Sequence, residues 1–409
     1  MKNKIKKIVN NKILYYIFST IYKFYYNFIL LFLLGNLFKI IPINKNKIVV
    51  CSYYGMDYGD NPKAIIDYIL EKDKEKKYKI IWVLNSDFYK KDNLPDKIKK
   101  VKYETISCLY ELVTAKIWID NSRKKFVPSK RKKQFYIQTW HGGLCLKKVE
   151  KDAEDSLPKL YIKRAKKDSK NADLFISNSK WESELYKKSF WYNGKILEYG
   201  LPRNDMLINN ENHKKIVKET FKKIGIDEKK KVLLYAPTFR KDFKLDHYNI
   251  NFKRIIESLK KKDGCDWIIL IKLHPNVANK SNLLKLPVNV INVSNYSDLY
   301  SLMLISDALI TDYSSLIFDY GYLNRPILIY APDIEKYNDD RGFMFNLYDL
   351  PFSISKNNNS LCNNILNFNN KEYLQKLSNF YKKVGLCETG KSSKKVAEII
   401  MKVCDKNEN

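Results

Sequence analysis

The chain has 409 residues, and its 75 Lys and Arg against 45 Asp and Glu give a formal net charge of +30. This length exceeds what one ordinary hydrophobic core supports and suits two domains. With 45% hydrophobic residues and only 13 Gly and 12 Pro, the composition excludes a largely disordered chain. The seven cysteines are scattered and form no Cys-x-x-Cys pair, so we predict neither a disulfide framework nor a zinc site.

The charge balance indicates a polyanionic partner, which is nucleic acid, anionic lipid or a phosphate-rich substrate. Aromatic and basic residues are not interleaved in a base-stacking motif, so we expect no nucleic-acid partner. No pair of carboxylates has obvious metal-ligand spacing, and we predict no tightly bound metal or cofactor.

The first 45 residues differ from the rest of the chain. Between Ile13 and Ile41 the sequence is almost wholly apolar and aromatic, with a few polar interruptions. A membrane-spanning helix needs about 20 apolar residues, and the interrupted run falls slightly short of this length. No small-residue cleavage site follows, as a signal peptide would require. We therefore predict a membrane-associating segment of one or two helices lying in the interface; the alternative is a helix buried in the protein core.

From Lys47 onward, short apolar strands alternate with helical patterns, which indicates parallel sheets covered by helices on both faces. Strands of a first series are expected at 47–54, 79–85, 115–121, 134–140, 174–179 and 195–200. Strands of a second series are expected at 231–237, 266–274, 288–294, 307–312 and 326–331. We predict an α/β chain with two doubly wound, Rossmann-like domains, residues 46–205 and 206–385, an interdomain cleft, and a C-terminal helix within 386–409. Ligands are expected at the carboxyl ends of the strands.

One literal motif, GLCETGKS at 385–392, satisfies the phosphate-loop pattern. The residues before it have a helical pattern rather than that of a buried strand, and a glutamate inside the loop would face phosphate. We therefore expect a turn in which Ser392 or Ser393 caps the terminal helix.

Two histidines follow predicted strands, one in each half of the chain. His141 precedes Gly142 and Gly143, whose missing side chains let the backbone approach a ligand closely. An imidazole there could act as a general base near neutral pH; the alternative is a structural histidine. His274 ends a strand of the second series.

Arginines lie at two further strand ends. Thr238 and Arg240 follow the strand that Pro237 terminates, and a guanidinium there suits phosphate oxygens. The alternative is an ordinary surface arginine. Arg203 and Asp205 lie in the turn at the domain junction, where they could bind a ligand or fix the linker.

The stretch LITDYSSLIFDY (309–320) places hydroxyl groups at the start of a short predicted helix. Thr311, Ser314 and Ser315, together with the free N–H groups of the helix, could hold a phosphate. Asp312 would then orient a hydroxyl group or a ribose. The alternative is an ordinary capped helix.

Taken together, these motifs resemble the CDP-glycerol glycerophosphotransferases of teichoic acid synthesis. The resemblance covers roughly residues 48 to 400 and depends on the number, order and spacing of short motifs. They are DNPKAI (60–65), QTWHG (138–142), LKK (146–148), GLPRND (200–205), YAPTFR (235–240), KLHP (272–275), SDALITDYSSLIFDY (306–320), RPILIY (325–330) and RGF (341–343).

The resemblance implies a GT-B fold and transfer of a polyol phosphate from CDP-glycerol or CDP-ribitol to a polyprenyl-linked or polymer acceptor, with release of CMP. It implies that His141 takes the proton of the acceptor hydroxyl, and that His274 helps hold the pyrophosphate and stabilise the leaving CMP. The implied donor-binding residues are Gly142, Arg203, Asp205, Thr238, Arg240, Thr311, Asp312, Ser314, Ser315, Asp319 and Arg341. Family members act at the cytoplasmic face of the cell membrane as peripheral proteins, in agreement with the N-terminal segment.

The chain departs from the family pattern at two places. It has HGGLCLKK where the family often continues as HGTP, and LPFSIS (350–355) where Pro-Gly-Pro commonly follows RGF. These departures affect the choice of acceptor more than the donor chemistry. The alternative function is a GT-B glycosyltransferase that uses a nucleotide sugar.

Overall fold

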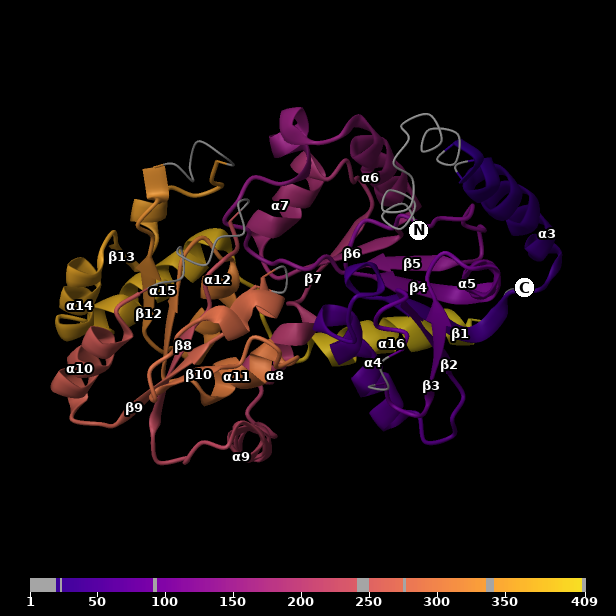
Figure 1. The fold of residues 1–409 in the computed structure, drawn as a ribbon. Coiled ribbons are helices and arrows are strands. Elements are labelled where there is room, and N and C mark those ends of the chain that lie inside the picture. The colour runs from indigo at the N-terminus through magenta and orange to yellow at the C-terminus, as the bar shows by residue number, and fades with distance from the viewer. Residues whose placement is uncertain are drawn as a thin grey trace.

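The computed structural model describes residues 20–22, 24–90, 94–240, 250–274, 277–335 and 342–406. Two parallel β-sheets, each covered by helices, lie on opposite sides of the molecule (Figure 1). The first sheet holds the strands of the amino-terminal half, and the second holds those of the carboxyl-terminal half. This α/β architecture of two parallel sheets is the predicted one.

The first sheet has the strand order β3-β2-β1-β4-β5-β6-β7, and its neighbouring strands all pair in parallel. Its strands are β1 (Asn44–Cys51), β2 (Lys79–Leu84), β3 (Ile98–Lys102), β4 (Ala115–Asp120), β5 (Phe135–Gln138), β6 (Leu174–Ser177) and β7 (Lys195–Glu198). The order reverses between β1 and β4. In sheets of this kind, ligands bind outside the carboxyl ends of the strands at such a reversal.

The second sheet has the order β10-β9-β8-β11-β12-β13 and is also parallel. Its strands are β8 (Lys231–Tyr235), β9 (Trp267–Ile271), β10 (Val290–Asn292), β11 (Ala308–Thr311), β12 (Ile327–Tyr330) and β13 (Ser353–Ser355). The order reverses between β8 and β11. Each sheet therefore has one reversal point at its carboxyl edge.

Alternate residues of each strand point to opposite faces and enter different hydrophobic cores. In β1, Ile48 and Val50 join one core, whereas Val49 and Cys51 join the other. The longer covering helices are α4 (Asp60–Lys72), α5 (Ile106–Thr114), α6 (Lys159–Asn171), α7 (Lys180–Ser189), α9 (His213–Ile224), α10 (Phe252–Asp263), α14 (Asn358–Leu366) and α15 (Asn370–Val384). Shorter helices are η3 (Tyr53–Gly55), η4 (Glu150–Ser156), η5 (Pro202–Asn204), α8 (Asp205–Ile208), η7 (Ala278–Leu283), α11 (Leu299–Ile305), α12 (Leu316–Tyr320), η8 (Gly321–Leu323) and η9 (Leu347–Asp349).

All the predicted strands are present, but β3 and β13 were not predicted. Both are edge strands. In β3, the two buried residues, Ile98 and Val101, are separated by two lysines that are not buried, and β13 has only three residues. Neither resembles the near-continuous apolar runs that mark the interior strands of a parallel sheet.

The last helix, α16 (Ser392–Asp405), returns to the first sheet and packs against α4, β1 and β4. Figure 1 shows it as the yellow helix beside α4. The motif before it follows the helix α15, as predicted, and not a strand. The predicted serine cap is wrong: the amides of Ser392 and Ser393 donate to the carboxylate of Asp205, at 2.8 and 2.6 Å. A carboxylate at a helix N-terminus satisfies free N–H groups and complements the helix dipole.

The amino-terminal helical segment comprises η1 (Tyr25–Leu34), α3 (Gly35–Leu37) and η2 (Phe38–Ile40). Leu30 is buried in the core beside α5, and Leu34 and Phe38 pack against the same core. Other apolar side chains of the segment are solvent-exposed, among them Phe32 and Ile40, which are 56% and 78% exposed. The segment is therefore partly buried in the protein core and partly exposed to solvent. Within the described residues, no helix has the length and apolar character needed to cross a membrane.

Candidate active site

His141 lies directly beyond β5, at the carboxyl edge of the first sheet. Its Nδ1 is 2.7 Å from the carbonyl oxygen of Asn121, which follows β4. Because a carbonyl oxygen only accepts hydrogen bonds, Nδ1 carries the proton and the lone pair of Nε2 is available. Desolvation by the surrounding protein lowers the pKa of His141 below its ordinary value, although the residue keeps a solvent-exposed face and the bond to Asn121 and the charge of Asp60 oppose this shift. The imidazole is therefore neutral at pH 7 and suited to accept a proton.

The backbone around His141 is strained. Tyr53, Tyr54, Asp60 and Trp140 all adopt positive φ values, between 47° and 62°. The Tyr53 and Trp140 rings lie against the imidazole, with centroids 5.7 and 4.3 Å from that of His141. Such conformations cost of order 1–3 kcal/mol each, persist only where surrounding contacts enforce them, and cluster at functional sites.

Asn61, at the start of α4, holds this strained segment in place. Its side-chain amide donates to the carbonyl oxygens of Thr139 and Trp140, at 3.4 and 3.1 Å. Its Oδ1 accepts from the backbone N–H of Arg203 at 3.1 Å. A single buried amide therefore links the residues before His141 to the segment between the two sheets.

Arg203 continues this link with its side chain. The guanidinium donates to the carbonyl oxygen of His141 at 2.6 Å, to Asp60 at 2.9 Å and to Asp319 at 2.8 Å. The side chains of the two ion pairs are at most 8% exposed. Asp60 begins α4 beside the first sheet, whereas Asp319 lies in α12 beside the second, where it also accepts from Tyr300 at 2.9 Å. Arg203 thus joins both halves of the molecule to the backbone of His141.

A second connection between the halves involves the LKK and RGF motifs. Lys147 forms an antiparallel bridge with Phe343. On either side of it, Met344 donates to Leu146 at 2.9 Å and Lys148 donates to Gly342 at 3.3 Å. These motifs are almost 200 residues apart in the sequence, and they lie together where the two sheets face each other.

Ser315 also takes part in this connection. Its hydroxyl accepts from the backbone N–H of Leu146 at 3.1 Å and makes no capping bond to α12. The hydroxyl of Ser314 accepts from the N–H of Leu316 at 3.3 Å, as a helix cap would. The two serines therefore have different roles: Ser314 caps, and Ser315 contacts the opposite half.

His274 follows β9 at the carboxyl edge of the second sheet. Its ring lies against Phe239, with centroids 4.6 Å apart. Burial, reinforced by the charges of Lys147 and Lys272, lowers the pKa of His274 to about 4. Lys147 belongs to the first half, so His274 faces across the junction. It is neutral at pH 7, and positive charge here comes from the two lysines.

Arg240 lies at the reversal point between β8 and β11, and its guanidinium is fully engaged by protein groups. Nε and Nη2 donate to Asp333, Nη2 is also 2.9 Å from Asp312, and Nη1 donates to both oxygens of Thr238. These contacts use all five N–H groups that an arginine has. To bind a donor phosphate, Arg240 would have to exchange one of these partners.

The other predicted donor-binding residues are placed as follows. Asp312 accepts from the backbone N–H of Thr238 at 2.9 Å, and the hydroxyl of Thr311 donates to Ala236 at 2.6 Å. Gly142 is half-buried beside His141. Arg341 lies outside the described residues.

Three more of the predicted ligands are, like Arg240, engaged by protein groups. Arg203 and Asp319 form buried ion pairs, and Asp205 caps α16. Their roles as donor ligands stay predictions. The residues that sequence analysis missed are Asp60, Asn61 and Asn121. Asp60 and Asn61 begin the DNPKAI motif, and Asn121 is a polar residue directly after a strand. The motif and the position after a strand could therefore have identified these residues from the sequence.

We predict that Arg203→Lys lowers the free energy of unfolding by about 1.5–3 kcal/mol, because an ammonium cannot reproduce the forked contacts to two carboxylates and a carbonyl. Chemical denaturation followed by circular dichroism measures this change. The matched control is Arg254→Lys on the exposed surface of α10, for which we expect less than about 0.5 kcal/mol. Equal losses in the two variants would contradict the structural role assigned to Arg203.

Comparison with known proteins identifies the chain. Residues 33–402 match the family described as CDP-glycerol:poly(glycerophosphate) glycerophosphotransferase. A teichoic acid poly(glycerol phosphate) polymerase of Bacillus spizizenii is 32% identical over 374 residues, which cover 88% of this chain and 93% of that protein. A polymerase of the same name from Staphylococcus epidermidis is 34% identical over 374 residues, and this chain spans about half of its length (51%).

A solved structure agrees with these matches. The wall teichoic acid polymerase TagF superimposes with a TM-score of 0.79 at 33% sequence identity, and the match covers 91% of this chain and 93% of that one. The fold described above is therefore the GT-B-like fold of that polymerase. The chain belongs to the CDP-glycerol:poly(glycerophosphate) glycerophosphotransferase family of enzymes.

Proposed function

We propose that this enzyme transfers glycerol phosphate from CDP-glycerol to a lipid-linked acceptor or a growing surface polymer and releases CMP, with CDP-ribitol as the alternative donor. The family description names CDP-glycerol and poly(glycerophosphate). The observation that supports this most is the hydrogen bond from His141 Nδ1 to Asn121, which leaves Nε2 as a neutral base at the carboxyl edge of the first sheet.

In the proposed reaction, His141 Nε2 removes the proton of the acceptor hydroxyl. The resulting oxygen attacks the phosphorus that carries the glycerol, and the bond between this phosphorus and the bridging oxygen of CMP breaks. A base with a pKa below its ordinary value of about 6.5 stays unprotonated at neutral pH. Activity should therefore still be retained at pH 6.5, where a free imidazole is half protonated, and should fall only at a lower pH, as the imidazole of His141 becomes protonated.

The second edge would hold the donor. His274, neutral at pH 7, can donate one hydrogen bond to a phosphate oxygen, and the charges of Lys147 and Lys272 lie close enough to lower its pKa. Fixed positive charge at the leaving phosphate stabilises the transition state of phosphoryl transfer. We propose that Thr238, Thr311 and Ser314 contact the CDP moiety; Thr311, which is buried and donates to Ala236, would first have to release that bond. The half-buried Gly142 and, beyond the described residues, Arg341 complete the proposed donor set.

Donor specificity tests the proposed function. We expect the purified protein, supplied with an acceptor, to release CMP from CDP-glycerol or CDP-ribitol and to leave UDP-sugars intact. His141→Ala and His274→Ala should each abolish CMP release with little change in thermal unfolding. Release of UDP from a UDP-sugar would instead indicate a glycosyltransferase, and near-normal turnover of either histidine variant would refute the role of that residue.

We further propose that the exposed apolar side chains of the amino-terminal helices contact the cytoplasmic face of the membrane as a peripheral anchor. Leu30, Leu34 and Phe38 of this segment pack against the core beside α5. These contacts fix the position of the segment and of its exposed apolar side chains. Apolar side chains of an interfacial helix enter the boundary between headgroups and acyl chains, and the net charge of +30 favours anionic lipid.

Co-sedimentation with vesicles of phosphatidylglycerol and phosphatidylcholine tests the membrane contact. Phe32→Glu should reduce the bound fraction several-fold, because a charge on the exposed face opposes insertion. Tyr348→Glu, at a similarly exposed aromatic residue beside the second sheet, serves as the matched control. Equal binding of wild type and Phe32→Glu would rule out this face as the anchor.

A further inference from the structure

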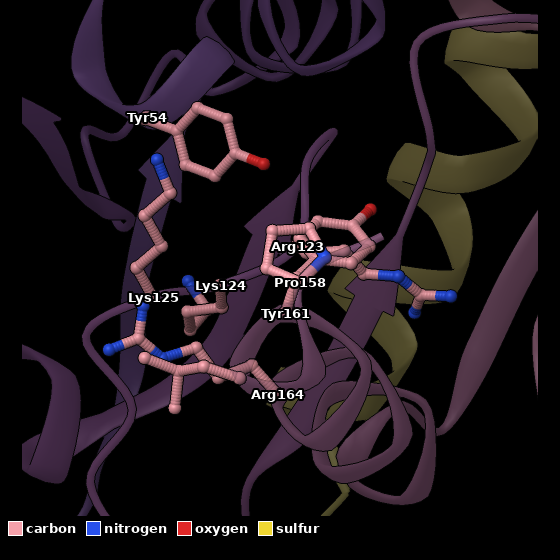
Figure 2. Close-up of a pocket in the computed structure, with 8 residues that line it drawn as sticks. Tyr54, Arg123, Lys124, Lys125, Pro158, Tyr161 and Arg164 are labelled. Atoms are coloured by element: carbon pink, nitrogen blue, oxygen red, sulfur yellow. The ribbon is translucent and has the colours of Figure 1, made fainter. Parts of the chain in front are cut away.

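A pocket of about 210 Å³ opens at the carboxyl edge of the first sheet, between the ends of β1 and β4 and the start of α6 (Figure 2). Tyr54 follows β1, Lys125 follows β4, and Pro158, Tyr161 and Arg164 belong to the start of α6 and its first turns. None of the residues proposed above to bind the donor lines this pocket. It is a separate feature of the first half of the molecule.

The pocket adjoins the proposed base. Tyr54 directly follows Tyr53, whose ring contacts the His141 ring. From the other side, the guanidinium of Arg123 in the pocket wall lies 5.6 Å from the Trp140 ring, and Trp140 in turn contacts His141. The pocket therefore lies next to the residues that contact the His141 ring.

The inner wall of the pocket is electrically balanced. Arg123 pairs with Glu150 at 3.1 Å and with Asp168 at 3.4 Å, and Lys124 pairs with Asp120 at 2.9 Å. All five side chains are buried. These two cations are thus matched by three acids, and they fix the wall without attracting an anion.

The rim of the pocket is different, because its two cations are exposed and close to each other. The ammonium of Lys125 lies 3.6 Å from the centroid of the Tyr54 ring, and Figure 2 shows the side chain extended toward that ring. Partial desolvation, followed by the charge of Arg164, lowers the pKa of Lys125, whereas the charge of Glu104 opposes this shift. Among the described residues, Arg164 forms no ion pair. The ammonium of Lys125 and the guanidinium of Arg164 can both donate charge-assisted hydrogen bonds to one anionic group.

The remaining surface of the pocket is apolar. Pro158 and Leu160 lie at its mouth, and Leu160 is 53% exposed. The backbone is strained here as well, since Tyr54 and Glu150 both have positive φ values, of 58° and 52°. A cationic rim beside apolar walls suits a phosphate group that is esterified to a carbon chain, because the cations bind the oxygens and the walls accept the carbons.

On the basis of the function proposed above, we propose that this pocket binds a phosphate group of the acceptor through Lys125 and Arg164, and so directs the acceptor hydroxyl toward His141. Two kinds of acceptor carry such a group. In a growing polymer it is a phosphodiester, and in a lipid-linked acceptor it is a diphosphate. Both present the same anionic oxygens beside carbon atoms.

Kinetics with two acceptors test this proposal. One acceptor is a water-soluble oligomer of glycerol phosphate, and the other is a prenyl diphosphate-linked sugar that carries no glycerol phosphate. We expect Lys125→Gln and Arg164→Gln each to raise the acceptor KM roughly tenfold, the change expected for one lost charge-assisted hydrogen bond. The KM for CDP-glycerol should not change. The effect should shrink at high salt, because salt screens exposed charges.

Lys170→Gln is the matched control, since Lys170 is an exposed lysine of the same helix outside the pocket. A raised KM for the oligomer alone assigns the site to the polymer phosphodiester, and a raised KM for the prenyl acceptor alone assigns it to the lipid diphosphate. Unchanged values for both acceptors, or an equal effect of Lys170→Gln, would overturn the proposal.

Calorimetric titration of the oligomer and of the prenyl acceptor, without any donor, gives a readout that does not depend on turnover. If the wild type binds either one and the two pocket variants bind it about tenfold more weakly, the pocket assignment holds even where no CMP is released. In that case the proposed function alone would fail. If CMP is released but neither kinetics nor binding responds to the pocket variants, the pocket assignment alone would fail.

Discussion

The side chain of Arg203 makes the contacts on which the arrangement of the active site depends. One guanidinium binds the carbonyl oxygen of His141 and two buried carboxylates, Asp60 beside the first sheet and Asp319 beside the second. A buried ion pair adds little net stability compared with apolar packing, but removal of one partner is costly because a charge is then left unpaired. The network therefore serves mainly to fix geometry, since it sets the position of His141 relative to both sheets at once.

The two edges that meet at this junction differ in character. The first combines a neutral imidazole, a strained backbone and a pocket with two cations at its rim, and in the proposed function these position and activate the nucleophile. At the second edge, Arg240 is held by Asp312 and Asp333, and His274 is neutral. Because both histidines have lowered pKa values, the proposed reaction assigns the positive charge at the phosphates to Lys147 and Lys272, although the ammonium of Lys272 already donates to the carbonyl oxygens of Ser294 and Tyr296. This division of roles agrees with acceptor activation on one side and donor binding on the other.

Sequence patterns predicted the features that depend on local order. Interior parallel strands are continuous apolar runs and were predictable, as were the edge strands β7 and β10, whereas the lysine-rich edge strand β3 and the three-residue edge strand β13 were not. His141 and Arg240 were predictable as polar residues at strand ends. The contacts of Arg203 could not be predicted, because its partners Asp60 and Asp319 lie 143 and 116 positions away in the chain. For the same reason the cap of α16 was assigned to its own serines, although Asp205, 187 residues earlier, supplies it.

A double-mutant cycle on CMP release from CDP-glycerol tests most directly whether Arg203 and Asp319 act as one unit that positions His141. The variants are Arg203→Gln, Asp319→Asn and the double variant, each compared with wild type by kcat. Residues that act as a unit show strongly non-additive effects. We predict that the double variant is no slower than the slower single variant. Effects on the free energy of activation that add within about 0.5 kcal/mol would contradict the account.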